Sequence, residues 1–187
     1  SSTSRGLGDV YKRQTQITKE KDLQTAFADW TKDGDYIITA KGRRNLKLHM
    51  YHKDGGSGVK LIDKPSSIKI TQPVVGSEDR YIWYAHRTSS WQYNARFPQY
   101  QISKFDRETG EIKRETSRFG SAFTPTLSPD GKWLVYGTRY EDKTALRIRN
   151  LKTGDERWLA YPIQKDDQES QALSLIHISE PTRRRGI

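Results

Sequence analysis

The chain has 187 residues, a formal net charge of +10 and no cysteine. The absence of cysteine excludes disulfide bonds and thiolate metal sites. No apolar stretch approaches the roughly 20 residues that a membrane-spanning helix needs, so the sequence predicts no such helix.

The two ends of the chain differ from the turn-rich sequence between them. Residues 173–178 read LSLIHI, and one set of codons for them is the reverse complement of codons for DVYKRQ at residues 9–14. This inverted element resembles the transposase mosaic end of tagmentation sequencing libraries, and the SEPTR that follows continues the adapter. Such segments are set aside before the fold is considered. We expect residues 1–14 and 173–187 to be adapter-derived and the natural sequence to lie within residues 15–172.

Setting both ends aside lowers the net charge. Each end contributes +2, from three basic residues against one acidic residue, so the central sequence carries +10 − 4 = +6. The basic residues that remain, among them Lys41, Arg43 and Arg147, alternate with apolar residues as they do on the solvated face of a strand. No basic stretch carries a recognisable nucleic-acid-binding module, so the sequence predicts no nucleic-acid partner.

The central sequence contains an internal repeat. The repeated stretches are WTKDGDYIITA at 30–40, GSEDRYIWYA at 76–85 and LSPDGKWLVYG at 127–137. Each places an acidic turn directly before a β-rich run, and aligning Asp33, Asp79 and Asp130 gives spacings of 46 and 51 residues. A strand–turn–strand unit with a glycine at its turn follows each stretch. These glycines are Gly55, Gly110 and Gly154.

The chemistry of each repeat favours strands joined by tight turns. In SPDG, Pro129 presets φ for the second position of a type I turn, and Gly131 suits the fourth. Runs such as Leu46, Leu48 and Met50 alternate with period 2, which buries one face of a strand. Four strands over roughly 40–50 residues are typical of a β-propeller blade, whereas a β-sandwich, the alternative, would not repeat its turn chemistry at this period. The predicted fold is all-β, an open, partial β-propeller of about three four-stranded blades at residues 23–64, 68–118 and 123–161.

Tryptophan recurs at matching places in these repeats. Four tryptophans fall at equivalent or near-equivalent strand positions, which predicts that they pack within the blades. They are Trp30, Trp83, Trp133 and Trp158.

The third repeat carries a resemblance to a known family. The run FTPTLSPDGKWLVYG and the LKTGDERWL after it resemble the TolB-like propeller repeat, in which S-P-D-G precedes a buried strand and an L-x-T-G hairpin follows. Residues 128–170 are similar to the propeller that precedes the hydrolase domain in large bacterial amidohydrolases. Prolyl-oligopeptidase-like peptidases use the same repeat, and in the second repeat GSEDR replaces SPDG. Because such propellers usually have about six or seven blades, we expect this chain to be a fragment.

The resemblance implies a function for the parent protein rather than for this chain. It implies a non-catalytic propeller portion of a larger hydrolase, with a downstream amidohydrolase domain that holds zinc or another divalent metal. No cofactor is expected in this chain. The implied partner is that catalytic domain or an envelope protein, and the implied location is periplasmic or secreted. Two alternatives stay open: a TolB-like protein-interaction scaffold, and the propeller of a prolyl-oligopeptidase-like serine peptidase.

The sequence predicts no catalytic or metal site of its own. An amidohydrolase needs His-x-His on a strand with further ligands, but the central histidines are His49, His52 and His86. On a strand, His49 and His52 would point to opposite faces and would not chelate one metal together. The GGSG at 55–58 resembles a serine-hydrolase elbow, but it lies in a predicted hairpin turn without the strand-to-helix context. His177 belongs to the adapter-derived end and is not expected to be a ligand.

One connection of the middle repeat is unusually long. Asp79 to Gly110 spans 31 positions, whereas Asp130 to Gly154 spans 24, and the extra length lies within RTSSWQYNARFPQYQ at 87–101. Long aromatic loops are frequently binding or domain-contact surfaces. The alternative is that the aromatic side chains pack on the propeller or extend a hairpin. The candidate interaction residues are Trp91, Tyr93, Arg96, Phe97 and Tyr100.

Overall fold

The computed structural model describes residues 16–18, 24–65, 68–87, 99–140 and 143–161. Within these ranges the regular structure consists of β-strands, and no helix is present. The described ranges accordingly include no helix able to cross a membrane. The strands form three antiparallel four-stranded sheets, which confirms the predicted all-β class and the predicted sheet number.

Each sheet is a blade whose strands follow one another in chain order. Blade 1 contains β1 (Gln24–Trp30), β2 (Tyr36–Gly42), β3 (Lys47–His52) and β4 (Val59–Lys60). Blade 2 contains β5 (Ile70–Val75), β6 (Tyr81–Arg87), β7 (Tyr100–Asp106) and β8 (Ile112–Arg114). Blade 3 contains β9 (Phe123–Leu127), β10 (Trp133–Tyr140), β11 (Lys143–Asn150) and β12 (Glu156–Ala160).

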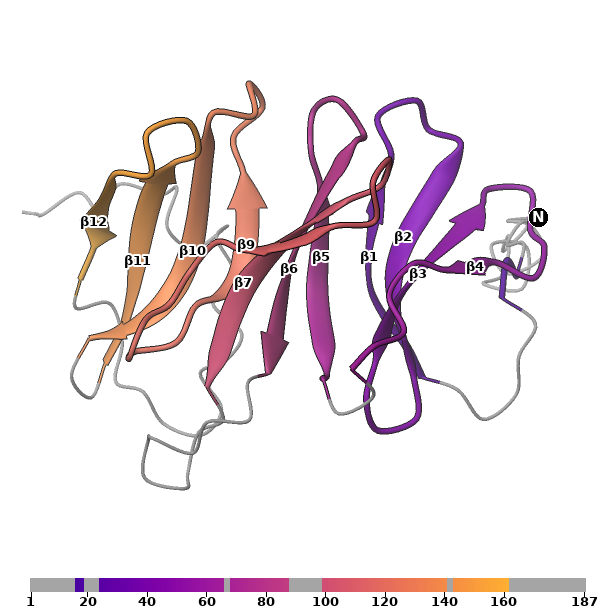
Figure 1. Ribbon diagram of the computed structural model, residues 1–187, viewed down its shortest axis with the longest axis horizontal. Coiled ribbons are helices and arrows are strands. Elements are labelled where there is room, and N and C mark those ends of the chain that lie inside the picture. Colours follow the sequence, from indigo (N-terminus) through magenta and orange to yellow (C-terminus); the bar gives the residue numbers. More distant parts are fainter. Residues whose placement is uncertain (1–15, 19–23, 66–67, 88–98, 141–142, 162–187) are drawn as a thin grey trace, which may run out of the picture.

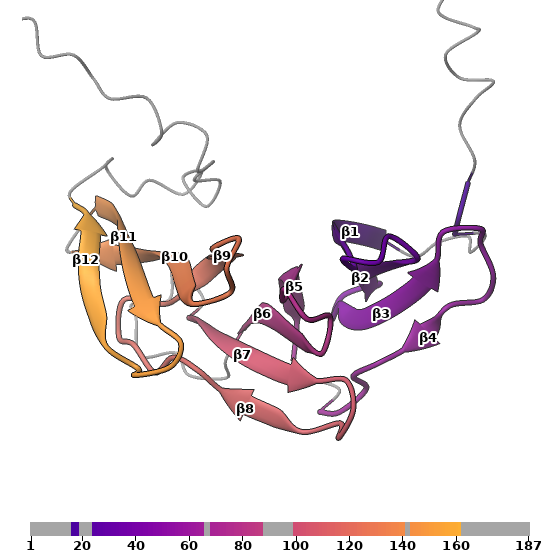
Figure 2. The same ribbon diagram turned by 90° about the horizontal axis from the view of Figure 1, so that it is seen from above.

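The three blades stand side by side, and Figure 1 shows them in chain order. Seen from above, they follow an open arc, with β1, β5 and β9 on the concave side and β4, β8 and β12 on the outer side (Figure 2). The innermost strands contact their counterparts in the neighbouring blade, β1 with β5 and β5 with β9. The predicted open arrangement of blades is therefore present.

The hydrophobic core lies between blades rather than within them. Ile38 and Leu48 of blade 1 pack with Ile82 and Tyr84 of blade 2, and all four are buried. Trp83, which lies between Ile82 and Tyr84 in β6, points to the opposite face of the sheet. It packs in a second cluster with Leu134 and Tyr136 of blade 3. A central blade is covered on both faces, which is why YIWYA is a continuous apolar run rather than an alternating one.

Trp30 does not follow the predicted packing. Its side chain is 50% exposed, whereas Trp83 is only 6% exposed. In the β1–β2 register Trp30 lies opposite Ile37, whose neighbour Ile38 points into the contact with blade 2. Trp30 therefore lies on the face of blade 1 that points away from blade 2, and the expectation of blade packing is wrong for this residue.

The innermost strand of every blade carries the same irregularity. Phe27 of β1, Gln72 of β5 and Thr124 of β9 have φ between 50° and 57°, in the left-handed region. Each lies where the pairing with the next strand shifts register. A bulge of this kind bends a strand and increases its twist. The Gln72 bulge also joins two blades, because its Oε1 accepts a hydrogen bond from the backbone N–H of Thr124 at 2.8 Å.

The turns between the first two strands of each blade show that the alignment of the three repeats on their aspartates is wrong in blade 2. The backbone N–H of Gly34, Asp79 and Gly131 each donates to the carbonyl three residues earlier, and all three residues have φ between 58° and 75°. Asp79 therefore corresponds to Gly34 and Gly131, at spacings of 45 and 52 residues, and not to Asp33 and Asp130. The alignment on aspartates is wrong by one residue in blade 2, because an aspartate there occupies the glycine position of the turn.

Candidate interaction surface between the second and third blades

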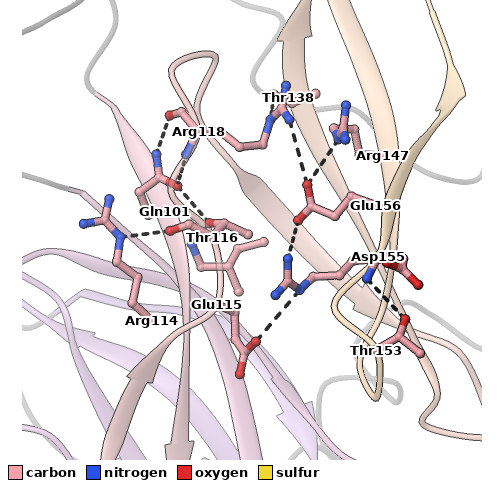
Figure 3. Close-up of polar contacts among 12 residues, drawn as sticks. Gln101, Arg114, Glu115, Thr116, Arg118, Thr138, Arg147, Thr153, Asp155 and Glu156 are labelled. Atoms are coloured by element: carbon pink, nitrogen blue, oxygen red, sulfur yellow. Dashed lines mark hydrogen bonds and ion pairs between the residues drawn. The ribbon is translucent and has the colours of Figure 1, made fainter.

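The connection between β8 and β9 leads from the outer strand of blade 2 to the inner strand of blade 3. Along this path it passes the face of β11 and β12 that points toward blade 2. Figure 3 shows Glu115, Thr116 and Arg118 of this connection facing Arg147 and Glu156 of blade 3. The outer half of this interface is therefore charged, in contrast to its apolar inner half.

Glu156 is the centre of this charged cluster. Its Oε1 lies 2.8 Å from Arg149 Nη1, and its Oε2 lies 3.4 Å from Arg147 Nε and 3.9 Å from Arg118 Nη1. One carboxylate of blade 3 thus holds two arginines of its own blade and one arginine from the connection out of blade 2.

Glu115 extends the cluster toward the middle of blade 2. Its carboxylate lies 3.6 Å from Lys104 Nζ and 4.0 Å from Arg149 Nε. The side chains of Glu115 and Glu156 are only 8% and 16% exposed, so both carboxylates depend on these partners for compensation of their charge. Among the described residues the cluster contains two carboxylates and four cations, which leaves an excess of two positive charges. The cations are Lys104, Arg118, Arg147 and Arg149.

A buried amide holds the connection in place. Gln101 Oε1 accepts hydrogen bonds from the Thr116 hydroxyl at 2.8 Å and from the Arg118 N–H at 3.0 Å. Its Nε2 donates to the Arg118 carbonyl at 2.6 Å, and Thr116 Oγ1 accepts from the Ile102 N–H at 2.8 Å. Gln101 thus satisfies both backbone groups of Arg118 from the middle of blade 2, which positions the guanidinium against blade 3 (Figure 3).

Aromatic side chains lie beside the arginines. The guanidinium carbons of Arg147 and Arg118 lie 4.6 Å and 5.3 Å from the Trp158 ring, and Tyr161 lies 5.2 Å from the same ring. Phe119, which follows Arg118 in the chain, is 66% exposed, and Tyr161 is 51% exposed. We call Arg118, Phe119, Trp158 and Tyr161 the aromatic–arginine surface. Tryptophan, tyrosine and arginine are the residue types that dominate binding at protein interfaces.

Four of the five residues predicted from the long loop, Trp91, Tyr93, Arg96 and Phe97, lie outside the described residues. Tyr100 is described. It opens β7, where its N–H donates to Ser121 Oγ at 3.1 Å and its carbonyl accepts from the Ala122 N–H at 2.8 Å. Burial raises the pKa of the Tyr100 hydroxyl above its usual value.

A hydrogen bond connects the residue before Tyr100 to the aromatic–arginine surface. The Gln99 side chain, next to Tyr100, donates to the Phe119 carbonyl at 3.1 Å. Sequence reasoning missed Phe119 and Tyr161 because each stands at the edge of a repeat, where no period identifies a face. The dipeptide Arg118–Phe119 in the connection between two repeats was the available signal.

The three described histidines have different partners. His49 lies opposite Thr39 in the β2–β3 register, and His52 Nδ1 lies 3.4 Å from Asp54 Oδ2. His86 Nε2 lies 3.0 Å from Ser103 Oγ, and burial lowers the pKa of His86. Within the described ranges, no group of three or more histidine or acidic side chains lies close enough together to hold a metal ion.

The sheets, their order and their stacking define a class of protein. Four-stranded antiparallel sheets whose strands run in chain order from the concave to the outer side, packed face to face around an arc, form part of a β-propeller. The predicted fold is confirmed.

Comparison with solved structures gives this fold a closer description. TolB from Acinetobacter baumannii matches with a TM-score of 0.62 and 24% identity, over 83% of this chain and 36% of that chain. A putative TolB from Agrobacterium tumefaciens matches with a TM-score of 0.61 and 18% identity, over 75% and 50%. A prolyl endopeptidase structure matches with a TM-score of 0.58 and 17% identity, over 79% and 23%.

These similarities establish a TolB-like β-propeller fold. At such sequence identities they show the fold alone and no shared activity. The chain spans half or less of the length of each of these three structures. No protein-family model matches the chain, and no curated protein matches it in sequence.

Proposed function

We propose that this chain is a non-catalytic β-propeller portion of a larger bacterial hydrolase, a metal-dependent amidohydrolase whose zinc or other divalent metal belongs to a separate catalytic domain. The propeller contacts that domain through the aromatic–arginine surface. The parent protein is periplasmic or secreted, as the TolB-like repeat implies.

The observation that carries the proposal is the aromatic–arginine surface itself. Phe119 and Tyr161 are more than half exposed although both are large aromatic residues. Arg118 is held in place by the buried Gln101, and its guanidinium lies over Trp158. Pre-positioned arginine and aromatic side chains lose little conformational entropy on binding, which favours an interface.

Two other parents are supported by specific similarities. Both TolB structures share this fold, which supports a free-standing scaffold that binds an envelope protein through the same surface. The prolyl endopeptidase structure also shares it, which supports the propeller of a serine peptidase. In all three cases this chain binds another domain or protein and does not itself catalyse a reaction.

Sequencing the source gene beyond residue 172 distinguishes the three parents. A downstream strand with His-x-His and further metal ligands is the expected result for an amidohydrolase. A downstream G-x-S-x-G elbow would assign the chain to a serine peptidase. A coding sequence that ends after the last blade would replace the hydrolase proposal with the scaffold.

Binding measurements test the surface. Once the downstream domain is known, its association with this chain is measured by calorimetry for wild type, Phe119→Ala and Tyr161→Ala. Each substitution is expected to weaken binding at least tenfold, because aromatic hot-spot residues contribute about 2 kcal/mol or more. Val59→Ala, which truncates an exposed apolar side chain of blade 1, is the matched control. Equal affinities for all four proteins would remove the surface from the proposal.

The non-catalytic assignment has its own test. The full chain is assayed against amide and ester substrates with and without added zinc, and no turnover above the buffer rate is expected. Metal-dependent turnover that survives purification would contradict it.

A further inference from the structure

Trp30 occupies a position that packs against the preceding blade in blades 2 and 3. A backbone hydrogen bond of 2.9 Å closes the turn after the innermost strand in every blade, and the residue before its donor is Trp30, Val75 or Leu127. Val75 is 1% exposed and belongs to the cluster shared with blade 1, and Leu127 packs against the cluster shared by blades 2 and 3. Trp30 is 50% exposed, and no described blade precedes blade 1. Trp30 therefore stands at an interblade contact position that lacks its partner blade.

Ile37 extends this contact position across the sheet of blade 1. It lies opposite Trp30 in the register, as Ile82 lies opposite Val75 in blade 2. Ile82 and its counterpart Leu134 in blade 3 are 0% exposed, and each lies in the cluster that its blade shares with the preceding blade. Ile37, by contrast, is partly exposed. We call Trp30 and Ile37 the open face of blade 1.

Blade 3 has an apolar face at the other end of the arc. Val135 points away from blade 2, because its neighbours Leu134 and Tyr136 pack against that blade and side chains alternate along a strand. Trp133 lies on the same side as Val135 by the same alternation, and Ile148 lies opposite Val135 in the register. All three side chains are partly exposed. We call Trp133, Val135 and Ile148 the open face of blade 3.

The open face of blade 3 matches the face that blade 1 uses against blade 2. Val135 and Ile38 each lie four residues after the glycine of their turn, and Ile38 lies opposite Met50 as Val135 lies opposite Ile148. Ile38 and Met50 pack in the cluster between blades 1 and 2. Blade 3 thus presents the side chains that a blade uses toward its successor, and blade 1 presents those that a blade uses toward its predecessor. One chain holds both halves of an interblade contact, at the two ends of an open arc (Figure 2).

We propose that two copies of this chain associate head to tail, with the open face of blade 3 in one copy packed on the open face of blade 1 in the other. A head-to-tail contact forms a closed ring where the rotation between partners closes. Two arcs of three blades make six, which lies within the range of four to eight blades found in propellers. The chain also spans half the length of one TolB structure, as one of two equal arcs would.

The closed pair has two identical contacts, and the second forms within a complex that the first has already made. Its effective concentration is therefore high, which strengthens the pair beyond the affinity of one contact. The contact uses other faces than the aromatic–arginine surface, and it does not rest on the proposed function.

The first test is the oligomeric state of the full chain, followed by sedimentation velocity over a wide range of protein concentration. A reversible dimer without larger species is expected. A monomer at every concentration would overturn the proposal and assign the open faces to further blades of a longer parent. Species larger than a dimer would overturn the closed pair.

Substitutions then locate the contact. Trp30→Asp and Ile148→Asp are each expected to weaken the dimer about a thousandfold, because loss of a hot-spot side chain costs about thirtyfold at each of the two contacts. Val59→Asp is the matched control. Val59 is 55% exposed, but it lies opposite Met50 and therefore on the side of blade 1 that points toward blade 2. It is expected to leave the dimer unchanged, and an equal effect of all three substitutions would contradict the assignment.

Mixing the two variants tests the head-to-tail arrangement. Either variant alone has a defect in every contact, whereas a mixed pair joins the intact blade 3 of Trp30→Asp to the intact blade 1 of Ile148→Asp. The mixture is expected to associate more tightly than either variant alone. A mixture that associates no more tightly, or a variant that still forms wild-type dimers, would exclude contact between these two faces.

A measurement on wild-type protein decides the question even if a variant fails to fold. Hydroxyl-radical labelling is compared at protein concentrations below and above the dimer transition. Labelling of Trp30 is expected to fall as the dimer forms, while labelling of Phe119, which is 66% exposed on the aromatic–arginine surface, stays constant. Unchanged labelling of Trp30 would overturn the proposal.

Discussion

Asp79 shows how a single residue can connect two blades. It occupies the left-handed position that glycine holds in the other two turns, at φ 58°. Its carboxylate accepts hydrogen bonds from the backbone N–H groups of Lys32 at 2.6 Å and Asp33 at 3.3 Å, in the turn of blade 1. Aspartate tolerates this conformation better than most residues, and the contact with blade 1 offsets its conformational cost.

Removing this carboxylate is expected to destabilise the protein. Asp79→Ala loses both hydrogen bonds and keeps the unfavourable φ, so we expect a loss of about 1–2 kcal/mol in the free energy of unfolding. Asp79→Gly also loses the hydrogen bonds but relieves the backbone, so its loss is expected to be smaller. Urea unfolding measures both. Glu78→Ala, an exposed neighbour in the same turn, is the control. Equal stability of wild type and Asp79→Ala would contradict the assignment.

Arg80 forms ion pairs with two acids of the β7–β8 hairpin, Asp106 at its base and Glu108 in its turn, with Arg80 Nη1 lying 2.9 Å from Glu108 Oε2. The Arg80 guanidinium donates to both oxygens of Asp106, at 2.7 Å and 3.1 Å on Oδ2 and 3.2 Å on Oδ1. Asp106 Oδ1 also accepts from the N–H of Glu108 at 2.9 Å, inside the turn. Hydrogen bonding to Arg80 lowers the pKa of Asp106 from 3.8 to about 2.

This pKa shift predicts how the hairpin contributes to stability as the pH changes. Because the folded-state pKa is the lower one, ionised Asp106 stabilises the protein above about pH 4, and this contribution is lost as the pH falls from about 4 toward about 2. Asp106→Asn is therefore expected to be less stable than wild type at neutral pH, with a difference that shrinks over that range. Urea midpoints at several pH values measure the difference, and Asp54→Asn, an exposed aspartate in another turn, is the control. A difference independent of pH would contradict the assignment.

At the scale of the whole molecule, the two interblade interfaces differ in chemistry. The contact between blades 1 and 2 centres on a cluster of aliphatic and aromatic residues, with the hydrogen bonds of Asp79 at one end. The contact between blades 2 and 3 combines a smaller apolar cluster with the charged cluster around Glu156. Among the described strands, each blade contacts only its neighbours in the chain. Stability should therefore divide into blade and interface contributions, as in repeat proteins.

Loss of the Glu156 charge is expected to destabilise blade 3 more than the other blades. Glu156→Gln leaves Arg118, Arg147 and Arg149 without their shared carboxylate, and we expect a loss of about 2 kcal/mol, less than for a fully buried pair because the cluster is partly exposed. Hydrogen exchange should show reduced protection in β9–β12 and unchanged protection in β1–β3. Glu111→Gln, an exposed glutamate in the β7–β8 turn, is the control. A uniform loss of protection across all blades would contradict independent blade stability.

Much of the fold follows from short-range patterns. Period-2 alternation and turns such as SPDG are local, because a strand's two faces and a turn's φ angles depend on a few adjacent residues. Those patterns predicted the strands and three four-stranded sheets. They did not predict that Trp30 is exposed, because its burial depends on whether another blade lies against that face. They also misaligned Asp79, because the backbone hydrogen bond that identifies its position in the turn cannot be read from the sequence.

The candidate sites depended on tertiary structure to a greater degree. The sequence by itself determined the repeat, its strands and its turn chemistry, since these are set by neighbouring residues. Only the tertiary structure brought Glu115 and Lys104 to the arginines of blade 3, and left Trp30 half exposed on the face of blade 1 that points away from blade 2. Contacts between residues dozens of positions apart arise from the way blades stack. That stacking is decided by the fit of whole faces, which no short sequence pattern records.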